Sequence, residues 1–311
     1  MQRRDFLTSA AALGAATFPT FSAAQTPAPP PPPARGPEPN PAPSGLPLAV
    51  RVGMTDWNLG KRGDISKIAL ARELGLDGIQ VSLTFPTDGT PHLRQPETQV
   101  AFKRAALQHG IQICSLAIGN PGKARLPFHT NPASAILLVE AVEVARSIGT
   151  TNILLPILGD SHIDMTSQAQ VATFVAMMKE VARYAETAGV IVALEDWISA
   201  EDNLRLLDAI GSDAVKVYYD ARNIKAKVHD PYGEPARLGA RIDQIHVKNG
   251  AQLMSDPEQL DWPRLAREYE AIGYRGWYVL ETGSPTGDFV ADTKANIEYV
   301  RRTFRMPAVS G

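Results

Sequence analysis

The chain has almost no cysteine and almost no excess charge. Its 311 residues include one cysteine, Cys114, so no intramolecular disulfide can form. The formal net charge of -2 leaves no basic field that would attract nucleic acid or anionic lipid. Cys114 lies in the strand-like run Ile111–Leu116, and a lone thiol in such a run is expected to be buried packing rather than a nucleophile.

What remains is the composition of an ordinary soluble globular protein. Hydrophobic residues make up 44% of the chain and charged residues 21%, both near the average for globular domains. The length allows one large domain or two small ones.

The first 24 residues have the organisation of an export signal. Arg3 and Arg4 are followed by Phe6 and Leu7, then by an Ala-rich apolar segment and the small residues 22–24. This order resembles a twin-arginine signal peptide with its cleavage site. The resemblance implies the twin-arginine export machinery as a partner and a periplasmic or exported location. The apolar segment is too short and too weakly hydrophobic for a stable membrane-spanning helix.

Residues 25–46 are dominated by proline, alanine and glycine. Such a segment cannot form a helix or a strand ladder and has little to bury, so we expect an extended, disordered linker. The folded domain is predicted to cover residues 47–306, with a short tail at 307–311.

Within this domain, strand-like and helix-like runs alternate to the end of the chain. The predicted strands are Ala49–Met54, Gly78–Leu83, Ile111–Ala117, Asn152–Leu158, Val190–Glu195, Val215–Asp220, a run holding His246, and Trp277–Glu281. The predicted helices are Asp64–Leu74, Glu97–His109, Ala133–Ser147, Ser167–Ala188, Ala200–Ile210, Asp261–Ile272 and Asp288–Phe304, and a long loop follows the sixth strand. Glycines that end helices stand at 75, 110, 149 and 189.

Eight such units in about 260 residues predict a (β/α)8 TIM barrel, whose sites form at the carboxyl ends of the strands. A doubly wound parallel sheet is the alternative. It is disfavoured because no Gly-x-Gly-x-x-Gly motif follows the first strand.

Four of the predicted strands end on side chains that bind metals. Glu195, Asp220, His246 and Glu281 belong to strands five to eight, which are consecutive in a barrel wall. Oxygen and nitrogen donors without a thiolate suit Mn, Mg, Co or Zn. The alternative is that each acid caps the following helix. Because four such residues occur in consecutive units, we predict that they share one divalent cation, since an unpartnered buried charge would cost several kcal/mol.

The sequence around these four residues resembles the xylose-isomerase-like superfamily of sugar isomerases and epimerases. The motifs are Ala-Leu-Glu195-Asp-Trp, Tyr-Tyr-Asp220-Ala-Arg-Asn, Gln-Ile-His246-Val-Lys-Asn and Gly-Tyr-Arg-Gly-Trp-Tyr-Val-Leu-Glu281. The resemblance covers residues 48–304.

This resemblance implies that Glu195 and Glu281 both bind the metal and form the acid/base pair. The cation stabilises an enediolate made from a carbonyl and its adjacent hydroxyl. One glutamate takes a proton from carbon, and the other returns it on the opposite face or at the neighbouring carbon. Asp220 and His246 would be ligands only, with the second imidazole nitrogen held by another side chain.

Further residues near these motifs are candidates for substrate binding. Glu201 matches a position that hydrogen-bonds a substrate hydroxyl in ketose epimerases, although it also suits the first turn of a helix. Lys248 and Arg222 could bind an oxyanion or be solvated charges. The remaining candidates are Asn223, three residues after the Asp ligand, His162, in the loop after the fourth strand, and Trp57 and Trp197, which could stack on a sugar or pack in the core.

Two positions depart from the pattern of the ketose epimerases. The residue three after the Asp ligand is Asn223 where those enzymes have histidine, and the residue six after the His ligand is Gln252 where they have arginine. Both departures argue against a simple free ketohexose as substrate.

The leading prediction is a metal-dependent isomerase or epimerase acting on a carbohydrate or keto-polyol. The same chemistry permits a lyase or dehydratase, and a non-catalytic sugar-binding barrel is a further alternative. A barrel endonuclease is disfavoured because it needs a larger set of histidines and the chain has six. Assembly into a homo-oligomer is left open.

The export signal leads to a direct test. Replacing both Arg3 and Arg4 with lysine should leave the precursor in the cytoplasm, because the twin-arginine pair directs the chain to that route. Fractionation of cells that express the two precursors measures this. Arrival of the twin-lysine variant in the periplasm at the normal rate would contradict the assignment.

Overall fold

The structure is a computed structural model that describes residues 49–86, 88–119, 133–227, 229–257 and 260–305. The predicted signal peptide (1–24), linker (25–46) and tail (307–311) lie outside the described residues. Among the helices that are described, none is both long and apolar enough to cross a membrane.

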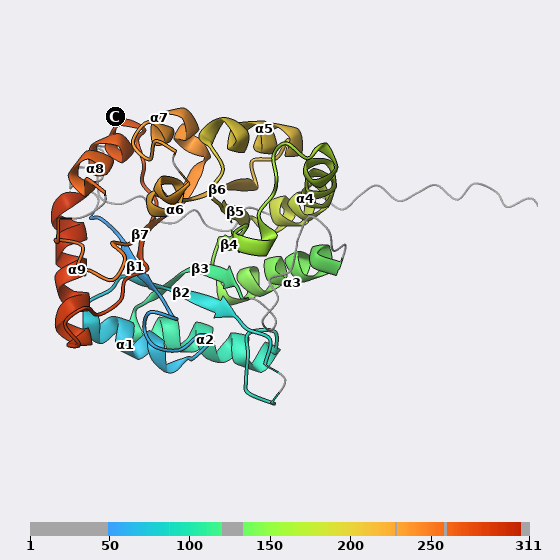
Figure 1. The fold of residues 1–311 in the computed structure, drawn as a ribbon. Coiled ribbons are helices and arrows are strands. Elements are labelled where there is room, and N and C mark those ends of the chain that lie inside the picture. The colour runs from blue at the N-terminus through green and yellow to red at the C-terminus, as the bar shows by residue number, and fades with distance from the viewer. Residues whose placement is uncertain (1–48, 87, 120–132, 228, 258–259, 306–311) are drawn as a thin grey trace, which may run out of the picture. The chain divides into compact units, whose positions relative to one another are not determined.

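The strands form a closed parallel barrel in chain order, with each strand paired to the next and β8 paired to β1 (Figure 1). The strands are β1 (Val52–Thr55), β2 (Gly78–Leu83), β3 (Gln112–Ile118), β4 (Asn152–Pro156), β5 (Ile191–Glu195), β6 (Val215–Asp220), β7 (Ile242–Val247) and β8 (Tyr278–Leu280). The predicted TIM barrel is therefore confirmed.

Helices surround the strands in the described part of the chain (Figure 1). They are α1 (Ser66–Leu74), α2 (Pro96–His109), α3 (Ala133–Ile148), α4 (Gln168–Ala188), α5 (Ala200–Ile210), α6 (Ala221–Ala226), α7 (Glu234–Leu238), α8 (Trp262–Ala271) and α9 (Phe289–Thr303), with short 3-10 turns at Gly159–Ser161 and Gly239–Arg241. The four predicted glycine stops all have the positive φ of a helix C-terminus.

Several predicted boundaries differ from the observed ones by one to three residues. The first strand begins at Val52 rather than Ala49, and the fourth ends at Pro156 rather than Leu158. Glu281 lies one residue beyond β8. The predicted loop after the sixth strand contains α6 and α7, because the Asp220 side chain accepts hydrogen bonds from two backbone N–H groups and so starts a helix at the strand end.

The strands are buried on both faces. The larger hydrophobic core lies between the strands and the helices, while a smaller cluster fills the barrel interior and contains Cys114, Leu154, Tyr218 and Val279. Cys114 is 5% exposed, and burial raises the pKa of its thiol to about 12. The prediction that Cys114 is packing material is confirmed.

A buried pair of acids joins the β5–α5 connection to α7. Asp196 accepts hydrogen bonds from the Ile198 N–H and the Asn203 amide, and Glu234 accepts one from the Ala200 N–H. One carboxylate oxygen of each acid is buried without a hydrogen-bond partner. Burial raises the pKa of both groups to about 7, and the like charge of the neighbouring acid raises the pKa of Asp196 further.

Glu234 should therefore make stability depend on pH. Between about pH 4.5 and pH 7 the folded chain keeps a proton that the unfolded chain releases, so stability falls as pH rises through this window. Glu234→Gln mimics the protonated acid. Between pH 5 and pH 8 its free energy of unfolding should therefore fall by about 1–3 kcal/mol less than that of the wild type. Melting temperatures at pH 5 and pH 8 measure the effect. Glu180→Gln, at an exposed site on α4, is the control, and identical pH profiles for wild type and Glu234→Gln would contradict the argument.

Candidate metal centre

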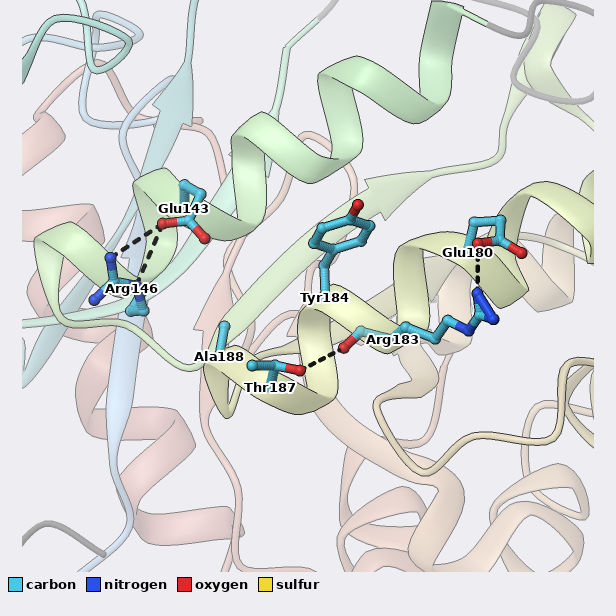
Figure 2. Close-up of a pocket in the computed structure, with 7 residues that line it drawn as sticks. All are labelled: Glu143, Arg146, Glu180, Arg183, Tyr184, Thr187 and Ala188. Atoms are coloured by element: carbon cyan, nitrogen blue, oxygen red, sulfur yellow. Dashed lines mark hydrogen bonds and ion pairs between the residues drawn. The ribbon is translucent and has the colours of Figure 1, made fainter. Parts of the chain in front are cut away.

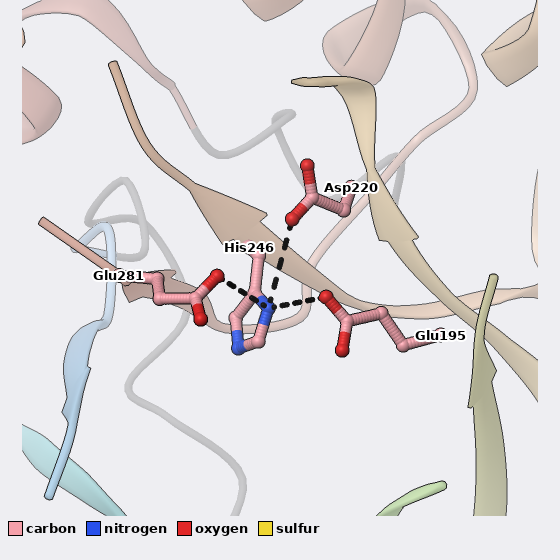
Figure 3. Close-up of side chains that lie close together, drawn as sticks. All are labelled: Glu195, Asp220, His246 and Glu281. Carbon is pink, nitrogen blue, oxygen red and sulfur yellow. Dashed lines mark hydrogen bonds and ion pairs between the residues drawn. The ribbon is translucent and has the colours of Figure 1, made fainter. Parts of the chain in front are cut away.

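Four side chains meet at the carboxyl ends of the last four strands (Figure 3). His246 Nδ1 lies 3.2 Å from Glu195 Oε1, 3.7 Å from Glu281 Oε2 and 3.9 Å from Asp220 Oδ2. His246 and the Asp220 side chain are fully buried, whereas the Glu281 side chain is 23% exposed. The predicted quartet is thus brought together, with Glu281 on its solvent side.

The barrel explains why residues so far apart in the chain converge. Glu195 and Asp220 end β5 and β6, and His246 is the penultimate residue of β7. Asp220 and His246 are direct neighbours in the β6–β7 register. Glu281 continues from β8, where its backbone N–H donates to the Val247 carbonyl. Parallel strands therefore deliver all four side chains to one end of the barrel.

Asp220 acts as a helix cap and also faces the cluster. Its Oδ1 accepts hydrogen bonds from the backbone N–H groups of Arg222 and Asn223 at 2.9 and 3.0 Å. Its Oδ2 is buried, forms an ion pair with Lys248 at 2.6 Å, and faces His246. The two interpretations considered from the sequence, cap and ligand, are compatible at this residue because each uses a different oxygen.

The second nitrogen of His246 is held from inside the barrel. Nε2 lies 3.0 Å from Gln80 Oε1, and the Gln80 amide donates to the Tyr218 hydroxyl at 3.1 Å and to Ser115 Oγ. With the Gln80 amide group donating to these hydroxyls, its carbonyl oxygen accepts from His246 Nε2–H. Burial lowers the pKa of His246, but the carboxylates that face Nδ1 raise it above its usual value. These carboxylates therefore favour a proton on Nδ1, which a bound cation would displace. The predicted second partner of the imidazole is therefore Gln80.

Lys248 supplies the positive charge nearest the carboxylates. Its Nζ lies 2.6 Å from Asp220 Oδ2 and 2.7 Å from Glu281 Oε2, and these carboxylates keep the pKa of Lys248 above its usual value despite burial. Burial alone would raise the pKa of Glu195, but His246 and Lys248 lower it to about 2. The carboxylate of Glu195 is therefore ionised at neutral pH.

The four side chains fit a divalent cation. One ligand atom from each lies within 4.8 Å of every other, and a cation that binds oxygen and nitrogen at about 2.0–2.2 Å holds opposite ligands about 4.4 Å apart. Asp220 Oδ2, which Lys248 contacts at 2.6 Å, and His246 Nδ1, which would offer a lone pair once it has lost its proton, lie 3.9 Å apart in this space. One dication together with Lys248 would balance the three carboxylates.

Two of the predicted substrate-binding residues touch the metal ligands. Trp57 Nε1 donates to Glu281 Oε1 at 3.2 Å, and its ring stands edge-on to His246 with the ring centres 6.3 Å apart. Asn223 Nδ2 donates to Glu195 Oε1 at 3.1 Å. Each glutamate is thus oriented by a neutral polar side chain on its Oε1, and Lys248 also contacts Oε2 of Glu281.

The other predicted residues lie around this centre. Arg222 packs over Gly250, where a Cβ would come within 2.7 Å of the guanidinium, so only glycine leaves room for it. Trp197 Nε1 donates to His162 Nδ1 at 2.7 Å, and this pair lines a separate cavity of about 260 Å³ with Lys227 and His229. Glu201 is exposed in the first turn of α5, where an acid interacts favourably with the helix N-terminus.

Three residues of the site were missed by the sequence analysis. Gln80 and Ser115 lie within strands and carry no motif, so only the closed barrel reveals their contact with the ligand set. Arg62, in the β1–α1 loop, lies over the ring of Trp57 with its Cζ 4.1 Å from the ring centre. A polar residue inside an apolar strand, such as Gln80, was the one available signal.

A groove of about 540 Å³ on the outer wall is unrelated to the metal centre (Figure 2). It lies between the last turns of α3 and α4, which are at the end of the barrel opposite the carboxyl ends of the strands. Its charged side chains pair within their own helices, with Arg146 on Glu143 at 3.1 Å and Arg183 on Glu180 at 3.0 Å. Exposed pairs of this kind contribute little to stability.

Gln80 provides a test of the metal centre. Gln80→Leu should weaken binding of Mn²⁺ or Zn²⁺ about 10- to 100-fold, because an unheld imidazole is a poorer ligand. His246→Ala should lose most of the metal, and with it the rise in melting temperature that metal gives. Calorimetric titration and elemental analysis measure both effects.

Gln244→Leu is the matched control, since Gln244 is also a buried glutamine of the barrel interior but bonds to the Cys114 carbonyl. Equal metal affinity in the Gln80 and Gln244 variants would remove Gln80 from the site. Stoichiometric metal in both His246→Ala and Asp220→Ala would overturn the ligand assignment.

Comparison with known proteins places the chain in a family. It is 26% identical over 212 residues, which are 65% of this chain and 74% of the relative, to 2-epi-5-epi-valiolone 7-phosphate 2-epimerase from Actinoplanes sp.. Among solved structures, D-psicose 3-epimerase from Clostridium cellulolyticum H10 has a TM-score of 0.68 at 15% identity, covering 82% of this chain and 100% of that one. A 3-keto-D-glucoside 4-epimerase from E. coli has a TM-score of 0.67 at 14% identity, covering 81% and 99%.

At these identities the solved structures are alike in fold. The sequence pattern of one family matches residues 68–303, which is most of the barrel. The chain belongs to the Xylose isomerase-like TIM barrel family.

Proposed function

We propose that this protein is a divalent-metal-dependent isomerase or epimerase that moves a proton between carbon positions of a keto sugar or related keto-polyol. The observation that carries the proposal is the placement of Glu195 and Glu281 on opposite sides of His246, within reach of one cation. Two carboxylates that flank one substrate-binding position are what removal and return of a proton require.

The relatives support this class of reaction. The Actinoplanes protein and the two solved structures described above are all named as epimerases of sugars or of a cyclitol phosphate. Their substrates differ, so they support the reaction type without fixing the substrate of this chain.

When bound, the divalent cation would act as a Lewis acid that stabilises negative charge on the substrate's carbonyl and hydroxyl oxygens. Glu195, Asp220, His246 and Glu281 would hold it. The remaining chemistry belongs to the side chains of the protein. Glu195 is ionised at neutral pH, because His246 and Lys248 hold its pKa at about 2, and it can accept a proton from carbon through an oxygen not bonded to Asn223.

Glu281 is suited to the opposite face. Trp57 and Lys248 each hold one of its two oxygens, and the side chain is partly open toward the mouth of the barrel. Lys248 can shift its ammonium group between Glu281, Asp220 and a substrate oxygen without leaving the cluster, because it already bridges the two carboxylates. We assign it to the binding of a substrate oxygen that gains charge as the proton leaves.

The location of this activity is a separate proposal. The Arg3-Arg4 motif and the Ala-rich segment behind it support export through the twin-arginine route. That route carries folded proteins, so a metal site assembled in the cytoplasm would arrive intact.

Substitution of the two glutamates tests the mechanism. Glu281→Gln and Glu195→Gln keep the size of the side chain and one oxygen donor but remove the base. Each should slow turnover of the substrate to its product by about 10²-fold or more, the usual scale for a positioned base. Proton NMR in deuterated water, on a panel of ketoses and aldoses with each candidate metal, measures exchange and product together.

The two variants should also differ in kind. One should still exchange the substrate proton without forming product, because its remaining glutamate works on that face, while the other should exchange nothing there. Asn223→Ala is the control, since it removes a hydrogen bond to Glu195 and leaves both bases in place. Near-normal turnover in either glutamine variant with metal fully bound would show that the glutamates are ligands only. Loss of water from the substrate would identify a dehydratase instead.

A further inference from the structure

A second cavity lies beside the metal centre, at the same end of the barrel. It has a volume of about 600 Å³ and is formed by the β1–α1 loop, the start of the β2–α2 loop and the first turns of α2. This volume is within the range of small-molecule sites in proteins. None of the four metal ligands lines it, so it is an additional space rather than part of the metal centre.

Arg62 forms the wall between the two spaces. Its guanidinium lines the cavity on one side and covers the ring of Trp57 on the other, at 4.1 Å from the ring centre. Trp57 in turn donates a hydrogen bond to Glu281. The cavity is thus two stacked planar groups away from a metal ligand, and a molecule that occupies both spaces must pass over the edge of this stack.

The position of this wall is fixed by a buried acid. Asp56 is 1% exposed and accepts hydrogen bonds from the Gly63 N–H at 2.7 Å and from both the N–H and the hydroxyl of Ser82. Arg62 donates to the same Ser82 hydroxyl at 3.2 Å. The β1–α1 loop is therefore tied to the end of β2, and the cavity is a built feature of the fold.

The lining of the cavity is mostly apolar and carries no net charge. Its apolar residues are Ile65, Pro86, Pro91, Ala101 and Phe102. The cations Lys61 and Arg62 are balanced by the acids Asp64 and Glu97. Asp64 accepts a hydrogen bond from the Ser66 N–H at the start of α1, and Glu97 lies in the first turn of α2, so an acid already lies at both helix N-termini nearby.

This charge pattern distinguishes between two kinds of ligand. A phosphate needs an excess of positive charge or a free helix N-terminus, and the cavity offers neither. An uncharged ring gains from apolar walls and from stacking on a guanidinium. The cavity therefore favours an aromatic or alicyclic group without charge.

We propose that the substrate is a sugar with an uncharged apolar substituent, such as an aromatic glycoside, and that this cavity binds the substituent while the sugar lies at the metal. The proposal rests on the proposed function for the location of the sugar. It extends that function by naming the substrate class. It also assigns to Arg62 the position between the cavity and the ring of Trp57.

Filling the cavity from α2 tests the proposal. Ala101 is exposed at the cavity wall, so Ala101→Trp should fill the cavity without disturbing the core. The probe is 4-fluorophenyl β-D-glucopyranoside, titrated into the Mg²⁺-loaded protein and followed by fluorine NMR. Ala101→Trp should weaken its binding about 10-fold or more, as expected when a ring loses an apolar pocket, and Ala101→Leu should give an intermediate loss.

Val100→Trp is the matched control. Val100 is the neighbouring residue of α2, is 56% exposed and does not line the cavity, so this variant should bind the probe within about 2-fold of wild type, the scale of surface substitutions. Melting temperatures verify that the variants are folded. Proton exchange on a free ketose should be the same in all of them, because none touches a metal ligand.

The outcomes separate this proposal from the proposed function. Absence of probe binding, or equal weakening by Trp at positions 100 and 101, would overturn the cavity assignment even if free ketoses exchange their protons. Displacement of the probe by D-fructose 6-phosphate but not by D-fructose would overturn it in favour of a phosphate site. Binding that Ala101→Trp abolishes would support the cavity even if no sugar tested exchanged a proton.

Discussion

The gathering of three carboxylates around one buried imidazole is the constraint on which this structure depends. Charges placed largely out of water repel each other strongly, and each would cost several kcal/mol if left without a partner. Lys248 offsets part of this cost through contacts of 2.6 and 2.7 Å with Asp220 and Glu281. A divalent cation would offset the rest, so the same ion would stabilise the folded chain and serve the proposed reaction.

The interior of the barrel supports this arrangement. Gln80 fixes the His246 ring from below through a hydrogen bond, and Tyr218 lies against the same ring with the centres 4.5 Å apart. The polar residues of the barrel interior therefore hold the candidate ligand His246 in position. A site whose ligands are held in this way needs little rearrangement before it binds a metal.

Much of the fold and of the ligand set could be predicted from sequence, for identifiable reasons. Alternating strand and helix patterns with glycine at helix ends are local signals, and they gave most element boundaries to within one or two residues. Glu195, Asp220 and His246 could be recognised because acids and histidine are uncommon at the ends of buried strands. Asp220 shows where such prediction stops. A helix cap and a metal ligand both select an aspartate at the end of a strand, so the residue type alone does not distinguish the two roles.

The residues that escaped prediction act through contacts between distant parts of the chain. Gln80 and His246 are 166 positions apart, and only closure of the barrel brings them together. The roles of Lys248 and Arg62 depend on which neighbour their flexible side chains reach, which no pattern of residue types specifies. His162 and Trp197 were placed at the correct end of the barrel, but their mutual hydrogen bond directs them into a cavity of their own.

The two halves of the barrel carry different duties. The four candidate metal ligands lie at the ends of β5 to β7 and directly after β8, whereas the apolar cavity is made by the segments that follow β1 and β2. Under the proposed function, a loop that changes in the first half would alter which molecule is admitted while the two glutamates stay in place, so substrate range could diverge independently of the reaction.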